Sequence, residues 1–120
     1  MKVVRSEDRE PLTAPDGSTV RELIGPPSDT AQSLSLAEAT VAPGAETIEH
    51  FHRTSEEVYV FVSGSGRMRL GEEEADVRAG DRVAIAPGAR HKLSNPGPEP
   101  LVLLCCCSPP YSDEDTVLCE

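Results

Sequence analysis

Residues 44–64 have the sequence GAETIEHFHRTSEEVYVFVSG, in which two histidines stand two positions apart and two glutamates follow. Side chains two positions apart on a β-strand point to the same face of the sheet. We therefore expect His50 and His52 to present both imidazoles to one side. A bend at residues 53–55 lets the chain return with Glu57 on one face of the next strand, where its carboxylate supplies an anionic oxygen. The segment predicts that two histidines bind a metal ion, with a carboxylate close by.

A third histidine lies in residues 80–95, GDRVAIAPGARHKLSN, where a turn at Pro87-Gly88 precedes the strand that carries His91. The chain has three histidines, and all of them fall in these two segments. Three imidazoles and one carboxylate form a mixed nitrogen and oxygen donor set that suits Mn, Fe, Co, Ni, Cu or Zn. The residues predict a site for one divalent transition metal and leave its identity open. The candidate metal ligands are His50, His52, Glu57 and His91.

Glu56 is the rival to Glu57 as the carboxylate ligand. It has the opposite strand parity, so we expect its side chain to be exposed to solvent.

The two segments resemble the paired motifs of the cupin superfamily, G-x5-H-x-H-x3,4-E-x6-G and G-x5-P-x-G-x2-H-x3-N. The first is matched in full, and the second departs at one position, where Ala86 replaces the motif proline and Pro87 stands beside it. The resemblance covers roughly residues 44–95 and implies a double-stranded β-helix, or jelly-roll barrel, with a metal held by the three histidines and Glu57. It also implies a homodimer, as in many members of this superfamily.

The rest of the chain supports an all-β fold. Short runs with period-two alternation are separated by turn residues, and no window combines a helical period with a cap and a stop. We expect a single domain over residues 1–120, with an N-terminal arm of about 1–17 and a C-terminal tail of about 108–120. The expected strands cover residues 19–24, 33–41, 46–51, 58–63, 67–70, 75–78, 82–85, 91–94 and 101–107.

Composition excludes several classes of partner. The net charge of −10 and the four Tyr and Phe side chains, with no Trp, argue against nucleic acid and against anionic membrane surfaces. No apolar run has the ~20 residues that a membrane span needs, and the start lacks the apolar stretch of a secretory signal. We expect a cytoplasmic protein, in which Cys105, Cys106 and Cys107 are small buried residues in a reducing compartment.

Several side chains are consistent with either a functional or a structural role, and we expect the structural role for each. Tyr59, Phe61, Met68, Ile85 and Leu93 can line a pocket, but core packing is the better prediction for each. Tyr111 can cover the barrel mouth as a lid, but we expect it on the surface.

The first functional hypothesis is a metal-dependent, dioxygenase-like enzyme that acts on a small organic molecule. The resemblance to cupin dioxygenases implies that Glu57 is the catalytic proton acceptor. Oxygenase chemistry is favoured over isomerisation because the sequence does not visibly place a second carboxylate or a lysine as a separate base. Two alternatives stay open: a non-catalytic cupin that binds a metal or ligand, and a metal-dependent sugar or sugar-phosphate isomerase.

Overall fold

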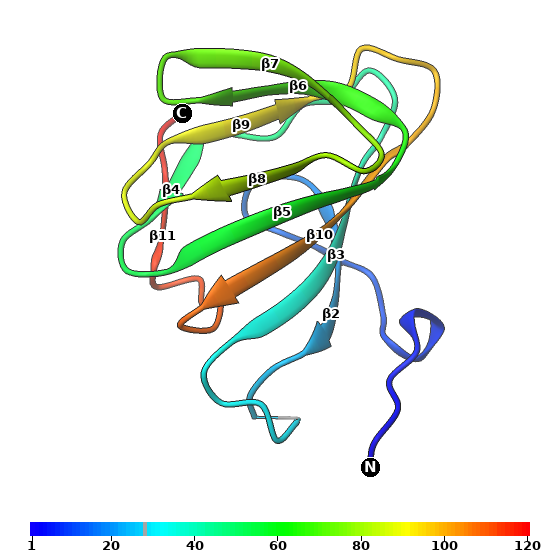
Figure 1. Cartoon of the computed structure of the whole chain (residues 1–120), viewed down its shortest axis with the longest axis vertical. Helices are drawn as coiled ribbons and strands as arrows, with labels where there is room; N and C mark the ends of the chain where they lie inside the picture. Colours follow the sequence, from blue (N-terminus) through cyan, green and yellow to red (C-terminus); the bar gives the residue numbers. More distant parts are fainter. Residues whose placement is uncertain (28) are drawn as a thin grey trace.

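The computed structural model describes residues 1–27 and 29–120, and in it two antiparallel β-sheets face each other (Figure 1). The described residues contain one short 3-10 helix, η1, and the strands β1 to β11. Their bounds are η1 Ser6–Asp8, β1 Leu12–Thr13, β2 Thr19–Ile24, β3 Ser35–Val41, β4 His50–His52, β5 Glu56–Ser63, β6 Ser65–Leu70, β7 Glu73–Arg78, β8 Arg82–Ile85, β9 His91–Ser94, β10 Leu101–Ser108 and β11 Thr116–Leu118.

The larger sheet has the order β1-β2-β3-β10-β5-β8, and the smaller sheet has the order β11-β4-β9-β6-β7. Consecutive strands repeatedly change sheet, as β3, β4 and β5 do, so the chain wraps around a shared interior (Figure 1). This arrangement is the double-stranded β-helix, and the predicted fold class is confirmed.

Alternation along the strands builds the interior. On β5, Glu57, Tyr59 and Phe61 are buried while Glu56 and Val58 face outward. Leu101 and Leu103 of β10 are fully buried between the sheets. At ~25 cal/mol per Å² of apolar surface, these buried side chains supply the main stabilisation of the barrel. Core side chains also include Ala39, Val41, Met68, Val77, Ile85 and Leu93.

Glycine is required where β5 turns into β6. Gly64 has a φ of +80°, and a Cβ there would collide with the carbonyl of Pro100. Only glycine combines this backbone conformation with so close an approach of two chain segments.

The expected strands match β2, β8 and β9 at both ends, and β4 differs most. We predicted residues 46–51, whereas β4 covers only His50–His52. Residues 45–48 are bonded irregularly to three other places in the chain: Ala45 accepts from Asn95, Thr47 donates to Leu93 and Ile48 donates to Asp16. The short strands β1 and β11 were not predicted.

Within the described residues, no helix has the length and apolar character that crossing a membrane requires. The four cysteines, all of them described, are free.

Candidate metal centre

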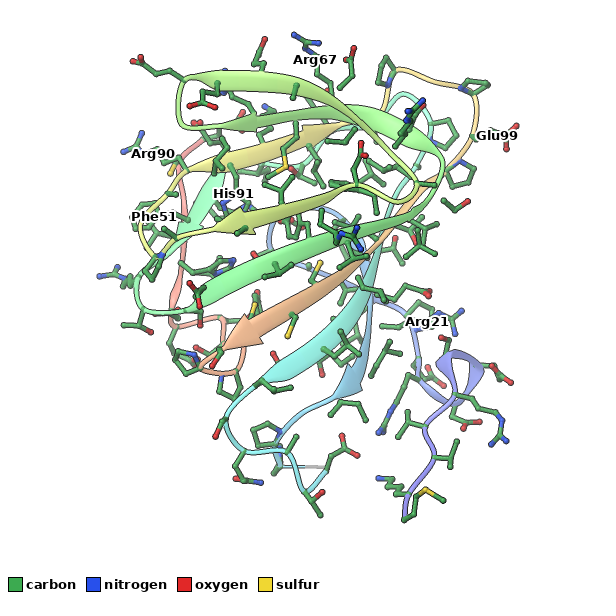
Figure 2. All side chains as sticks on the ribbon, in the orientation of Figure 1. Arg21, Phe51, Arg67, Arg90, His91 and Glu99 are labelled. Carbon is green, nitrogen blue, oxygen red and sulfur yellow. The ribbon has the colours of Figure 1, made fainter. Side chains whose placement is uncertain are left out.

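The four predicted ligands come from both sheets. His50 on β4 lies directly opposite His91 on β9 in the antiparallel register, and His52 is on the same face of β4. Glu57 reaches the same place from β5 of the other sheet. In Figure 2 His91 lies inside the barrel, whereas its neighbour Arg90 projects outside. The site is therefore enclosed between the sheets.

The donor atoms of these residues converge. One ring nitrogen from each of His50, His52 and His91 lies within 4.8 Å of the others. Glu57 Oε1 is 3.1 Å from His52 Nε2 and 3.5 Å from His91 Nε2. All four residues are buried, each with a relative exposure of 4% or less. The structure thus brings together every residue of the predicted set, while Glu56 is exposed as expected.

Hydrogen bonds at the outer side of the rings fix which nitrogen faces the centre. His50 Nδ1 and His91 Nδ1 lie 2.9 Å from the carbonyls of Ile48 and Ala89, and a carbonyl can only accept. Each Nδ1 therefore carries the proton and donates. In a neutral ring this leaves the lone pair on Nε2, which is the form that binds a metal.

His52 is held in the same way by the C-terminal segment. Its Nδ1 lies 3.0 Å from Thr116 Oγ1, and the Thr116 hydroxyl donates to the carbonyl of Ser112. Since the hydroxyl proton is used there, Thr116 accepts from His52 Nδ1. In its neutral form each of the three imidazoles therefore has a lone pair at Nε2.

The centre consequently holds more acceptors than donors. Among the residues that the structure describes, His91 Nε2 has no hydrogen-bond partner, and its side chain is 1% exposed. His52 Nε2 contacts a carboxylate oxygen, an arrangement that needs a shared proton or a cation between the two atoms. A divalent ion bound by all four side chains satisfies both groups at once, so the residues present fit a metal.

The protonation states favour metal binding. Burial, together with the nearby His91, lowers the pKa of His50, so its ring is neutral at physiological pH. Burial alone would raise the pKa of Glu57, but protonated His52 and His91 and the Cys107 thiol, as hydrogen-bond donors to the carboxylate, outweigh it and lower that pKa to about 2. The site offers a neutral imidazole and an ionised carboxylate, as metal ligation requires.

Cys107 of β10 holds the other oxygen of Glu57. Its thiol donates to Glu57 Oε2 across 3.2 Å. Burial and the charge of Glu57 raise the pKa of Cys107, which keeps the thiol protonated. We infer that this residue orients the carboxylate so that Oε1 faces the histidines.

The C-terminal segment packs against β4, the strand that carries His50 and His52. β11 pairs with β4, and the Asp115 carboxylate accepts from the backbone of Thr54 and Ser55 and from the Thr54 hydroxyl. These bonds secure the bend between His52 and Glu57. The sequence suggested only a solvated acidic tail here, because three strand residues after an acidic run carry no strong signal.

Asp16 is a further polar group at the centre, and sequence reasoning missed it. Its Oδ2 lies 3.9 Å from His50 Nε2. The sequence analysis placed Asp16 in the N-terminal arm of residues 1–17, and nothing local indicated that this residue lies beside the histidines. The sequence showed no second carboxylate placed as a separate base, and the structure adds the Asp16 carboxylate beside His50.

A cavity of about 510 Å³ opens from the centre. Tyr59 and Leu93 contribute to its wall as well as to the core, whereas Phe61, Met68 and Ile85 belong to the core alone. Tyr111 is 36% exposed and also lines the cavity, with its ring centroid 5.8 Å from that of His52. The cavity gives a small molecule a route to the histidines.

Two motif residues outside the ligand set hold the segments in place. The Gly88 N–H, in a turn with a φ of +82°, donates to the carbonyl of His52 over 2.7 Å. The Asn95 side chain is 1% exposed and donates to the carbonyls of Val41 and Glu99. The turn before β9 closes despite Ala86 at the motif's proline position, because Ala89 donates to its carbonyl.

The cupin domain family model matches residues 37–107, which include all four converging side chains. The chain belongs to the cupin family. Its relatives include protein MJ1618 of Methanocaldococcus jannaschii, which is 44% identical over 122 residues covering 100% of this chain and 98% of that protein.

Solved structures show the same fold at lower identity. The nucleoside dehydratase Pac13 from Streptomyces, solved with uridine, has a TM-score of 0.81 at 18% identity, covering 100% of this cupin and 92% of that chain. A predicted oxalate decarboxylase from Thermotoga maritima has a TM-score of 0.77 at 22% identity, covering 89% and 98%. At these identities the likeness concerns the barrel and leaves the reaction open.

Proposed function

We propose that this cupin is a metal-dependent enzyme for a small organic molecule, with His50, His52, Glu57 and His91 as ligands of one divalent transition metal. The observation that carries the proposal is the unpartnered Nε2 of His91, buried beside Glu57 in a cluster of lone pairs that only a cation or protons can satisfy. Four protein ligands leave two positions of an octahedral metal for water or substrate.

The protein groups divide the work around such an ion. When bound, the ion supplies Lewis-acid or oxygen-activating chemistry. The backbone carbonyls of Ile48 and Ala89 hold two of the imidazoles in their ligating tautomer. Glu57 is the proton acceptor, and the Cys107 thiol fixes its orientation.

The reaction class that we favour is dioxygenase-like oxidation. The cavity beside the histidines has apolar walls formed by Ala39, Val41 and Leu103, which exclude water around a bound molecule. The alternatives are a non-catalytic cupin in which the metal staples the barrel, and a metal-dependent sugar or sugar-phosphate isomerase.

One set of measurements separates these functions. We would determine the metal content of the purified protein, load it with Fe(II) or Mn(II), and follow oxygen consumption with enols, catechols and diketones. Oxygen uptake with any of these supports the proposed function. Bound metal without turnover supports the non-catalytic alternative, and turnover of phosphosugars supports the isomerase.

Glu57→Gln should weaken metal binding at least about tenfold and leave the fold intact, because it removes the anionic ligand but preserves the volume of the side chain. Isothermal titration with Mn(II) and a circular dichroism spectrum check the two parts of this prediction. Glu56→Gln is the matched control, since the neighbouring carboxylate is exposed and should change nothing. The reverse behaviour of the two variants would show that Glu56 is the ligand.

We also propose that this cupin is a homodimer that works in the cytoplasm. The outer face of β5 exposes Val58 at 36% and Val62 at 51%, and Leu104 and Cys106 of β10 continue this apolar surface as the register partners of Val60 and Val58. Light scattering on the purified protein should give twice the chain mass of 12.8 kDa. A Val62→Lys variant should shift that mass towards the monomer, and a monomeric wild type would contradict the prediction.

A further inference from the structure

The charged side chains that line the cavity are mainly acidic. Among the described residues around it, six carry carboxylates: Glu10, Asp16, Glu22, Asp29, Glu57 and Asp113. Arg9 is the sole Lys or Arg in this described lining, and its guanidinium lies 3.5 Å from Asp29. The cavity therefore carries an excess of negative charge.

Asp16 directs part of that charge at the metal centre. Its Oδ1 accepts from the backbone and hydroxyl of Ser18 at 2.9 and 2.7 Å, which fixes the carboxylate. Its Oδ2 has no donor among the described residues and faces His50 Nε2 across 3.9 Å. This free oxygen therefore borders the place where His50 would hold an ion.

A second observation supports a bound group at the place that Asp16 faces. His91 Nε2 is unpartnered, and its side chain is 1% exposed and directed into the same cluster. Its ring centroid lies 4.3 Å from that of His50, the histidine that Asp16 faces. A carboxylate with one free oxygen thus borders a centre that already requires a cation.

We propose that Asp16 accepts a hydrogen bond from a hydroxyl group of the ligand, and that the cavity selects uncharged, hydroxyl-bearing small molecules over anions. This inference rests on the proposed metal function. An ionised carboxylate can only accept hydrogen bonds, so a hydroxyl satisfies it and an anion does not. The charges of Glu57 and Asp16 together cancel those of a divalent ion, which leaves an incoming anion no net attraction.

Asp16→Asn in the Co(II)-loaded protein tests the proposal, with catechol as the uncharged dihydroxy probe and azide as the anionic probe. Asparagine keeps the oxygen that accepts from Ser18 but removes the charge. The variant should bind catechol about tenfold more weakly, because a charge-assisted hydrogen bond is lost. It should bind azide about tenfold more tightly, because a nearby negative charge is gone.

Visible absorption of Co(II) reports both titrations, and the metal content should equal that of the wild type. Asp76→Asn, which alters a carboxylate with an 87% exposed side chain on β7, is the matched control and should leave both affinities unchanged. Unchanged affinities in Asp16→Asn, or tighter binding of azide than of catechol by the wild type, would overturn the proposal.

Loss of Co(II) from Asp16→Asn would also overturn it, since Asp16 would then be a metal ligand. A wild type that binds no Co(II), Mn(II) or Fe(II) would overturn the proposed function itself and this inference with it.

Discussion

His91→Ala should weaken metal binding on the order of 100-fold or more. Removal of a residue that only orients a metal ligand costs roughly 10- to 100-fold in affinity, and removal of the ligand itself should cost at least as much. His91 Nε2 has no hydrogen-bond partner among the described residues, so its loss removes a proposed ligand and breaks no hydrogen bond made by that atom. Competition titration with a metal chelator measures the affinity.

The same variant predicts a distinct stability profile. Saturating metal should raise the melting temperature of the wild type, because a ligand at 100 times its Kd adds about 2.7 kcal/mol to the stability of the folded state. His91→Ala should lose that metal-dependent increase. Lys92→Ala is the control, because Lys92 belongs to the same strand but pairs with Glu46 and Glu120 on the outside. A variant with the metal response of the wild type would contradict the assignment of His91 as a ligand.

Deletion of residues 111–120 should lower the free energy of unfolding by about 3 kcal/mol or more, since several hydrogen bonds worth roughly 1 kcal/mol each are lost. The deletion removes the pairing of β11 with β4. It also removes the three hydrogen bonds that the Asp115 carboxylate accepts from Thr54 and Ser55. Metal affinity should fall with it, because the bend between His52 and Glu57 loses its anchor. Urea denaturation with and without Mn(II) measures both effects.

Thr116→Val separates positioning from general stability. Valine preserves the shape of the side chain and suits the strand, but it cannot accept from His52 Nδ1. We expect metal affinity to fall about tenfold while the apo protein melts close to the wild type. Thr19→Val, at an exposed position of β2, is the control. Unchanged metal affinity in Thr116→Val would show that Thr116 does not support the centre.

A truncated chain as stable as the full one would show that the C-terminal segment as a whole does not support the centre.

Local pattern was sufficient for much of the barrel. Alternation on β5 predicted that Glu57, Tyr59 and Phe61 share a buried face, and the turn residues around Gly80 and Gly88 bounded β8 and β9 correctly. The spacing of His50 and His52 predicted their shared face for the same reason, because the period of a strand is two residues. These features depend on residues that are close in the sequence, so they can be predicted without knowing which strands pair.

Features that depend on contacts between distant segments could not be predicted from the sequence. β4 is shorter than predicted because residues 45–48 bond to Asn95, Leu93 and Asp16, and β11 exists because β4 offers it an edge. Asp16 and Thr116 lie near opposite ends of the chain, yet each contacts a histidine of β4. Their local sequences predict an N-terminal arm and a polar tail, and no local property distinguishes either residue as a functional one.

The sequence alone determined the family, the all-β fold class and the identity of the four converging side chains, because two spaced motifs and strand periodicity are properties of the linear order. Only the tertiary structure decided that the histidines of one sheet face the Glu57 of the other, that Cys107 and Thr116 hold two of these groups, and that Asp16 adds a second carboxylate. These contacts join residues up to 64 positions apart, and their geometry exists only once two sheets close around a common interior.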